Sequence, residues 1–224
     1  MIDHEFKPET LAIHAGQMPD PATGARALPI YQTTSFVFDS ADHAASLFNL
    51  QTFGNVYSRL SNPTVAALEE RVAALERGRA AVASASGMAA EAMALMTLLQ
   101  AGDHVVAAGA LYGGSVTMLA VNLAKFGIET SFVDGSTAEA FAAAIRPSTR
   151  ALYAETLGNP SLLVLDIAAI ADVAHAHGLP MIVDNTVPSP FLCNPLALGA
   201  DIVVHSATKY LAGHGTTLGG VIVE

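Results

Sequence analysis

Apolar positions follow two kinds of pattern along residues 62–224. Short apolar runs are typical of buried strands, and longer segments with apolar residues three or four positions apart are typical of helices. Helical patterns separate most of the strand patterns, which predicts an α/β domain with a mostly parallel sheet flanked by helices. The predicted strands are Ala80–Ser84, His104–Ala108, Glu129–Val133, Ala151–Glu155, Met181–Asp184, Ile202–His205 and a last one from Gly220, and the helices include Met88–Leu99, Gly114–Lys125, Thr137–Ile145 and Ile167–His177.

A further helix is predicted to begin after Asn62. This asparagine can cap the helix, and Pro63 fits its first turn. Gly78 is expected to end the helix. The apolar residues expected along one face are Val65, Leu68, Val72 and Leu75.

Residues 1–60 show few periodic segments. They contain the stretches GQMPDPATGARALP, QTTSFVF and FGNVYSRLSNPT, which predict an extended arm with short elements ahead of an α/β domain over residues 61–224. The last residues, from Gly220 to Glu224, lie inside a predicted strand. We therefore expect the chain to be a shortened form of a longer protein.

Composition narrows the possible partners. The chain has 224 residues, of which 52% are hydrophobic and 13% charged, so it can bury a large core. Its net charge of −10 disfavours nucleic acid and anionic membranes as partners. Cys193 is the only cysteine, which excludes an internal disulfide. The opening residues lack a secretory signal, and polar residues interrupt the most apolar stretch, Ala80–Ala101, so we expect a cytoplasmic protein without a membrane span.

Two residues at predicted strand ends carry the main chemical signal. Lys209 follows the buried run Ile202–Val204, behind the hydroxyls of Ser206 and Thr208, and Asp184 ends the preceding strand. Pyridoxal phosphate (PLP) chemistry needs a lysine that forms a Schiff base with the aldehyde and an acid that keeps a proton on the pyridine nitrogen. The alternatives are a solvated surface lysine and an aspartate that accepts a local backbone N–H.

Two further segments allow more than one interpretation. Ser86-Gly87-Met88 follows a strand and opens a helix, so it can bind a phosphate at the helix N-terminus or form an ordinary glycine turn. Tyr112, in LYGGS, can stack on an aromatic cofactor and move a proton, or pack in the core.

The histidines near Lys209 raise the question of a metal. His205 and His214, with Asp201, are close together in the sequence, but their spacing matches no common zinc signature. We therefore favour structural roles for both histidines and predict no metal site, with a histidine-based metalloprotein as an alternative.

Six motifs occur in order along the chain: YSRLSNPT, ASGMAA, LYGGS, ETLGNP, IVDNT and HSATKYLAGHGT. In them the chain resembles the Cys/Met metabolism family of PLP-dependent enzymes. The resemblance implies the large domain of an aspartate aminotransferase-like (fold-type I) transferase. Within the family, DPATGARALPIYQTTSFVF, the GNP after Glu155-Thr156-Leu157, and GHGTTLGG resemble the O-acetylhomoserine sulfhydrylase branch.

The resemblance implies a role for each matching residue. Lys209 would form the Schiff base and move protons, Asp184 would pair with the pyridine nitrogen, and Tyr112 would stack over the ring. The arm would reach a neighbouring subunit, which implies a homo-oligomer, namely a tetramer built from dimers that share active sites. The remaining cofactor contacts would be Gly87, Met88, Ser206 and Thr208 to the phosphate, Asn159 to the ring hydroxyl, and Tyr57 and Arg59 to the neighbour's phosphate.

The implied reaction is γ-replacement on O-acetyl-L-homoserine by sulfide or a small thiol, which gives L-homocysteine and acetate. The alternatives within the family are cystathionine γ-synthase and methionine or cystathionine γ-lyase. In this family an arginine of a C-terminal domain binds the substrate carboxylate, and the sequence given ends before that domain. A non-catalytic cofactor-binding fragment is therefore the alternative of another class, and we expect the fragment by itself to be inactive.

Overall fold

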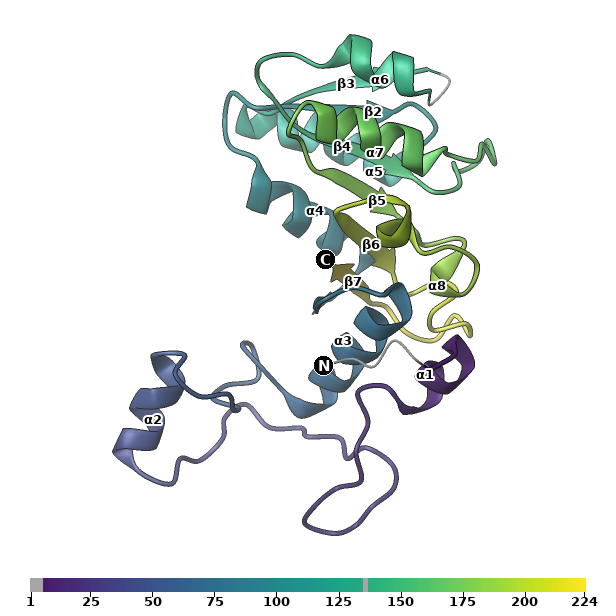
Figure 1. The fold of residues 1–224 in the computed structure, drawn as a ribbon. Helices are drawn as coiled ribbons and strands as arrows, with labels where there is room; N and C mark the ends of the chain where they lie inside the picture. Colours follow the sequence, from purple (N-terminus) through teal and green to yellow (C-terminus); the bar gives the residue numbers. More distant parts are fainter. Residues whose placement is uncertain (1–5, 135–136) are drawn as a thin grey trace. The chain divides into compact units, whose positions relative to one another are not determined.

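The structure is a computed structural model that describes residues 6–134 and 137–224. Contacts between residues divide the chain into two units, Met1–Arg71 and Val72–Glu224, and the boundary lies inside helix α3 (Pro63–Glu76). The larger unit contains the sheet and most of the helices (Figure 1).

The larger unit is built on a seven-stranded sheet with the order β1-β7-β6-β5-β4-β2-β3. Strands β2 to β6 pair in parallel with one another, whereas β7 pairs antiparallel with both of its neighbours, β1 and β6. The predicted α/β fold with a mostly parallel sheet is thus confirmed. The strands are β1 (Ala81–Ser84), β2 (His104–Ala108), β3 (Glu129–Val133), β4 (Thr149–Glu155), β5 (Met181–Asp184), β6 (Ile202–Ser206) and β7 (Gly220–Val223).

Parallel strands are covered on both faces, which is why their sequences read as continuous apolar runs. Every residue of β2 is buried, and so are all residues of β4 except Arg150. The helices of this unit are α4 (Gly87–Leu98), α5 (Gly113–Thr117), α6 (Ala138–Ala144), α7 (Ile167–Ala176) and α8 (Ser189–Leu192), with a 3₁₀ turn η3 (Pro195–Leu198).

The prediction of one continuous α-helix over Gly114–Lys125 is wrong, because the segment changes its helix type twice. Helix α5 passes into a π-helical segment, η1 (Met118–Asn122), and then into a 3₁₀ turn, η2 (Leu123–Phe126). With this change of hydrogen-bond pattern Met118, Leu119 and Leu123 are all buried. The segment ends at Gly127, whose φ of 77° lies in the left-handed region that glycine adopts without strain.

Helix α3 begins as predicted and ends differently. The backbone N–H of Thr64 donates to Asn62 Oδ1 at 2.9 Å, which confirms the cap. The left-handed residue after the helix is Arg77, with a φ of 60°, rather than Gly78. Gly78 is required for another reason: a Cβ there would lie 2.3 Å from Val223 Cγ1 on β7.

The apolar face predicted for α3 is only partly buried. Val72 is buried, but Val65 and Leu68 are 41% and 46% exposed. Small residues take the buried positions instead, because alanines allow close packing: they are Ala67, Ala73 and Ala74.

The smaller unit contains two short helices, α1 (Pro8–His14) and α2 (Ala41–Phe48), joined by long irregular segments. Ser35 and Tyr57 form an antiparallel bridge, and Arg71 Nε donates to the Ala15 carbonyl at 2.9 Å. The reach of this arm to a neighbouring subunit stays a prediction.

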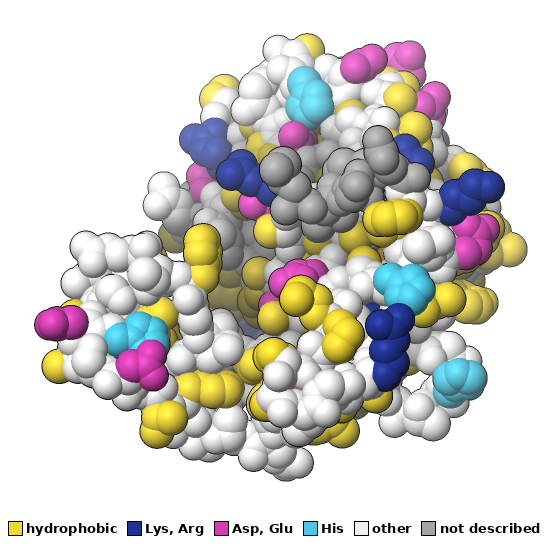
Figure 2. All heavy atoms as spheres, turned by 60° about the horizontal axis from the view of Figure 1, so that its bottom comes forward, with side chains coloured by type: hydrophobic (Ala, Val, Ile, Leu, Met, Phe, Trp, Pro, Cys, Tyr) yellow, Lys and Arg dark blue, Asp and Glu magenta, His cyan; other side chains and the backbone are white. Residues whose placement is uncertain are grey.

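Two surface properties bear on the expected partners. Over residues 6–134 and 137–224, no helix combines the length and the apolar character needed to cross a membrane. On the face drawn in Figure 2, the Lys and Arg side chains of the described residues are few and stand scattered among acidic and uncharged ones.

Candidate cofactor-binding site

A cavity of about 440 Å³ lies within the unit Val72–Glu224. Glu155, Asp184 and Ser206, which line it, are the last residues of β4, β5 and β6. The pocket therefore lies at the carboxyl ends of parallel strands, where ligands bind in open α/β sheets. The remaining lining residues are Ser86, Gly87, Met88, Glu91, Tyr112, Leu157, Asn159, Thr186, Val187, Thr208, Lys209, Tyr210 and Leu218.

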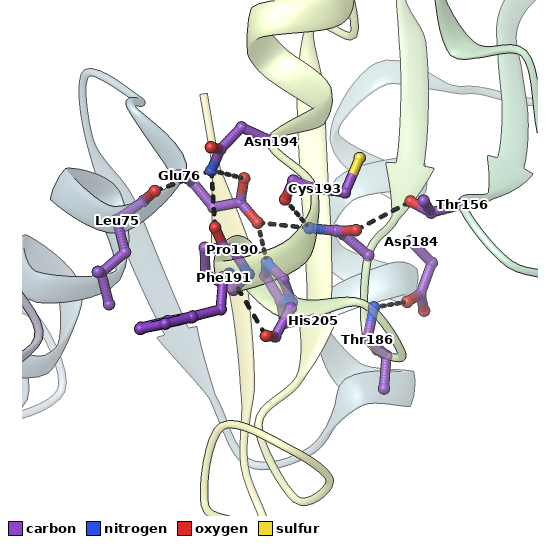
Figure 3. Close-up of polar contacts among 12 residues, drawn as sticks. Leu75, Glu76, Thr156, Asp184, Thr186, Pro190, Phe191, Cys193, Asn194 and His205 are labelled. Carbon is purple, nitrogen blue, oxygen red and sulfur yellow. Dashed lines mark hydrogen bonds and ion pairs between the residues drawn. The ribbon is translucent and has the colours of Figure 1, made fainter. Parts of the chain in front are cut away.

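Thr186 joins the strand ends that carry the acid and the lysine. Its backbone N–H donates to Asp184 Oδ1 at 2.8 Å, and its hydroxyl accepts the backbone N–H of Ser206 at 2.7 Å (Figure 3 shows the first bond). The N–H of Lys209 donates to the Ser206 carbonyl at 3.2 Å, in the turn that follows β6. These bonds bring Lys209 and Asp184 to the wall of one pocket, although 25 positions (209 − 184) separate them in the sequence.

The start of α4 faces the same pocket. Ser86 caps the helix, since its Oγ accepts the N–H of Ala89 at 3.1 Å. A Cβ on Gly87 would lie 2.5 Å from the Cβ of Ser206, so glycine is what allows the helix to approach the end of β6. A helix N-terminus beside the Ser206 and Thr208 hydroxyls is a set of donors suited to a phosphate.

Tyr112 lies at the pocket rather than in the core. Its side chain is 51% exposed, so the alternative of a packed core aromatic is wrong. Its backbone N–H donates to Glu155 Oε1 at 2.6 Å. A Cβ on Gly114 would lie 2.4 Å from Tyr112 Cε1, so this glycine leaves room for the ring.

Three carboxyl groups line the pocket. Glu91 is only 3% exposed, and its Oε1 accepts the hydroxyl of Ser115 at 3.0 Å. Burial, and next the charge of Asp184, raise the pKa of Glu91 to about 8. Burial also raises the pKa of Glu155 to about 7, and it raises the pKa of Asp184 above its usual range. Three carboxyl groups in one pocket favour the binding of a cationic group, such as a protonated pyridine nitrogen.

Sequence reasoning missed the roles of Glu91 and Glu155. Glu91 was one of the polar residues that interrupt the apolar stretch Ala80–Ala101, and Glu155 was the end of a predicted strand and the first residue of the ETLGNP motif. The signal was present in the sequence. Burying a carboxylate in an apolar helix or at the end of a buried strand costs free energy unless the carboxylate has a partner, so both residues indicate a site. Other lining residues that it missed are Thr186, Val187, Tyr210 and Leu218.

The raised pKa values predict a pH-dependent stability of the cofactor-free protein. Folded Glu91 and Glu155 keep protons that the unfolded chain releases above about pH 4.5, so unfolding free energy should fall as pH rises to about 8. Glu91→Gln imitates the protonated form and should raise the unfolding free energy at about pH 8 by on the order of 2 kcal/mol. Urea unfolding at several pH values measures this.

Glu139, an exposed residue of α6, provides the control for this prediction. Glu139→Gln should leave the slope of stability against pH unchanged. Equal slopes for Glu91→Gln and the unmodified protein would show that Glu91 ionises normally in the fold.

The structure brings eight of the ten predicted cofactor contacts to this one pocket. They are Gly87, Met88, Tyr112, Asn159, Asp184, Ser206, Thr208 and Lys209. Tyr57 and Arg59 belong to the unit Met1–Arg71, where the Arg59 guanidinium carbon lies 5.4 Å from the centroid of the Tyr57 ring. The individual roles of all ten residues toward a cofactor stay predictions.

The histidines do not form a metal centre with Asp201. His205 is buried and hydrogen-bonded to Glu76, while His214 is exposed. Asp201 accepts the backbone N–H of Met181 at 2.8 Å and contacts His175. Among the described residues, no three His, Cys, Asp or Glu side chains are grouped to hold a metal ion.

The residues of the pocket fit PLP by their chemistry. Lys209 provides an amine for the aldehyde, and Asp184 an acid for the pyridine nitrogen. The start of α4, with Ser206 and Thr208, provides donors for the phosphate, and Tyr112 provides an aromatic face for the ring.

Known proteins have similar sequences and folds. The chain is 58% identical over 223 residues to the O-acetyl-L-homoserine sulfhydrylase of Leptospira meyeri, covering 100% of this chain and 50% of that protein. A solved Campylobacter jejuni structure, named as an O-acetylhomoserine (thiol)-lyase with N'-pyridoxyl-lysine-5'-monophosphate, matches with TM-score 0.94 and 42% identity, over 98% of this chain and 54% of that one. The cystathionine gamma-lyase of Lactobacillus plantarum, complexed with L-serine, matches with TM-score 0.89 and 42% identity, over 97% and 55%.

The chain spans about half the length of the curated relatives it matches. A family model described as Cys/Met metabolism PLP-dependent enzyme matches residues 9–224. The match covers nearly the whole chain and agrees with the pocket, the sheet and the relatives. This chain therefore belongs to the Cys/Met metabolism family of PLP-dependent enzymes.

Proposed function

We propose that the protein carrying this chain catalyses γ-replacement on O-acetyl-L-homoserine with sulfide or a small thiol, giving L-homocysteine and acetate. The observation that carries the proposal is the convergence of Lys209, Asp184 and Tyr112 on one pocket beside the start of α4. The names of relatives such as the Leptospira meyeri sulfhydrylase support the choice of substrate. Because this chain spans half of such proteins, the activity is proposed for the whole protein.

The side chains of the pocket have separate roles in this reaction. PLP, when bound, supplies an electron sink for the carbanion formed at the substrate. Lys209 Nζ would hold the cofactor and would take and return protons at the substrate carbons. Asp184 keeps a proton on the pyridine nitrogen. The hydrogen bond from Tyr112 N to Glu155 holds the tyrosine at the pocket wall, where its ring can stack and assist proton transfer.

A second candidate comes from the same family. The match to the Lactobacillus plantarum cystathionine gamma-lyase favours a γ-lyase, which would remove the γ-substituent of its substrate without replacing it by a thiol. Both activities need the same lysine, acid and phosphate contacts, so the pocket described here is compatible with either.

The test is a product assay with the whole protein. O-acetyl-L-homoserine plus sulfide should give homocysteine and acetate, while cystathionine and methionine alone should react far more slowly. The reverse pattern, with 2-oxobutyrate and ammonia from cystathionine and no homocysteine, would establish the γ-lyase instead. Reduction with borohydride should attach the cofactor to the protein in either case.

We also propose that the enzyme works in the cytoplasm as a homotetramer built from dimers that share active sites. Tyr57 and Arg59 would serve the phosphate of a neighbouring subunit, since a planar guanidinium pairs with phosphate oxygens through two hydrogen bonds. The observations that support this role come from the smaller unit alone. Both side chains are exposed there, and the Arg59 guanidinium lies over the Tyr57 ring.

Mixing two inactive variants of the whole protein tests the shared site. Arg59→Ala should weaken PLP binding through the loss of charge-assisted bonds, each worth about 1.5–3 kcal/mol, and Lys209→Ala should be inactive. In a mixed dimer one site receives both intact residues, so random exchange should restore about a quarter of the normal activity. No recovery after verified subunit exchange would show that Arg59 serves its own subunit.

A further inference from the structure

A buried hydrogen-bond network lies behind the pocket and forms no part of its wall (Figure 3). His205 Nε2 and Glu76 Oε1 are 2.6 Å apart, and Asn185 Nδ2 donates to the same oxygen at 2.8 Å. Asn185 Oδ1 in turn accepts the hydroxyl of Thr156 at 3.0 Å. Glu76, His205 and Asn185 are each 0% exposed. The network thus joins the end of α3 to β6, β5 and β4.

Donors surround the carboxylate of Glu76. Besides Asn185, the side-chain nitrogen of Asn194 lies 3.5 Å from its second oxygen and donates at 2.9 Å to the Leu75 carbonyl. A carboxylate oxygen accepts hydrogen bonds from such groups, and His205 Nε2 lies at hydrogen-bond distance from the same oxygen that Asn185 contacts. His205 Nδ1 has no hydrogen-bond partner among the described residues, which leaves Glu76 to orient the ring.

Three residues of the network are chain neighbours of pocket residues: His205 lies in β6, and Thr156 and Asn185 directly follow β4 and β5. Side chains of consecutive strand residues point to opposite sides, so one member of each pair can serve the pocket while the other enters the network. Backbone bonds tie the same strand ends together, from Thr156 N to the Asp184 carbonyl and from Asn185 N to the Val204 carbonyl, both at 2.9 Å. The neighbouring pairs are Glu155–Thr156, Asp184–Asn185 and His205–Ser206.

We propose that Glu76 and His205 are positioning residues for the cofactor pocket. Through Asn185 and Thr156 they hold the ends of β4, β5 and β6 in register, so that Glu155, Asp184 and Ser206 face one bound molecule. The inference rests on the proposed PLP site and adds residues that do not touch it. Its physical basis is that these buried polar groups lose their hydrogen bonds if the strands shift, which penalises every other arrangement of the three strand ends.

The experiment compares Glu76→Gln and His205→Gln with a matched buried histidine in the whole protein. His104 is 1% exposed at the amino end of β2, the opposite end from the pocket, and bonds Thr149 at 2.8 Å and Ser131 at 2.9 Å. His104→Gln therefore disturbs a buried histidine network without reaching the strand ends that carry the site.

The readouts are the dissociation constant of PLP, the position of its visible absorption band on Lys209, and the melting temperature without cofactor. Glu76→Gln and His205→Gln should weaken PLP binding about tenfold and shift the band, because Asp184 moves relative to the pyridine nitrogen. His104→Gln should change the dissociation constant less than about twofold even if it lowers the melting temperature as much.

Thr156→Val decides the question if the first two variants do not accumulate as folded protein. It keeps the side-chain shape and removes the bond to Asn185, so it should weaken PLP binding about threefold to fivefold. If all folded network variants bind PLP as His104→Gln does, with unshifted bands, the inference is overturned while the proposed function stands. If the unmodified protein forms no reducible adduct with PLP, the proposed function fails, and the inference with it.

Discussion

Replacing Lys209 by alanine is expected to abolish the covalent attachment of PLP and to lower turnover by three orders of magnitude or more, about 4 kcal/mol in activation free energy. The chain contains three lysines, Lys7, Lys125 and Lys209, and of these Lys209 lines the pocket. The reaction needs this amine twice, first to hold the cofactor and then to move protons at the substrate. Its loss therefore removes two functions at once.

Visible absorbance and borohydride reduction of the whole protein measure the loss. Lys125→Ala is the matched control, because Lys125 is an exposed residue of η2 outside the pocket, and it should leave both absorbance and turnover unchanged. A reducible PLP adduct that persists in Lys209→Ala would assign the attachment to another lysine.

Asp184→Asn is expected to lower turnover about a thousandfold, again about 4 kcal/mol, with little effect on folding. Asparagine keeps the oxygen that accepts the Thr186 N–H at 2.8 Å, so the local turn survives. It also relieves the fold of a buried acid whose pKa burial has raised. What it cannot do is keep a proton on the pyridine nitrogen by opposing its charge.

Turnover and urea unfolding of the same preparations separate the two effects. Asp166→Asn is the control, because Asp166 caps α7 through its Oδ1 and asparagine caps a helix equally well. This variant should match the unmodified protein in both measurements. Near-normal turnover of Asp184→Asn would show that the aspartate only shapes the turn after β5.

The sequence was sufficient to locate the sheet and the main polar groups at one edge of it. Buried parallel strands need continuous apolar runs, so strands such as His104–Ala108 and Met181–Asp184 agree with their predicted bounds. Parallel strands place their carboxyl ends along one edge, and for that reason Asp184 and Lys209 could be expected to meet. The six motifs identified the family from the same residues.

Only the tertiary structure decided which groups support that edge. Tyr112 meets Glu155 across 43 positions of sequence, and His205 meets Glu76 across 129. A local pattern records whether a residue is apolar, but not which distant partner makes a buried charge tolerable. Glu76 lies near the end of the helix predicted after Asn62 but gave no signal of its own, and Glu91 is one of the polar residues that interrupt Ala80–Ala101. Their burial beside His205 and Ser115 depends on how helices pack against strands, and that packing sets both their partners and the pKa of Glu91.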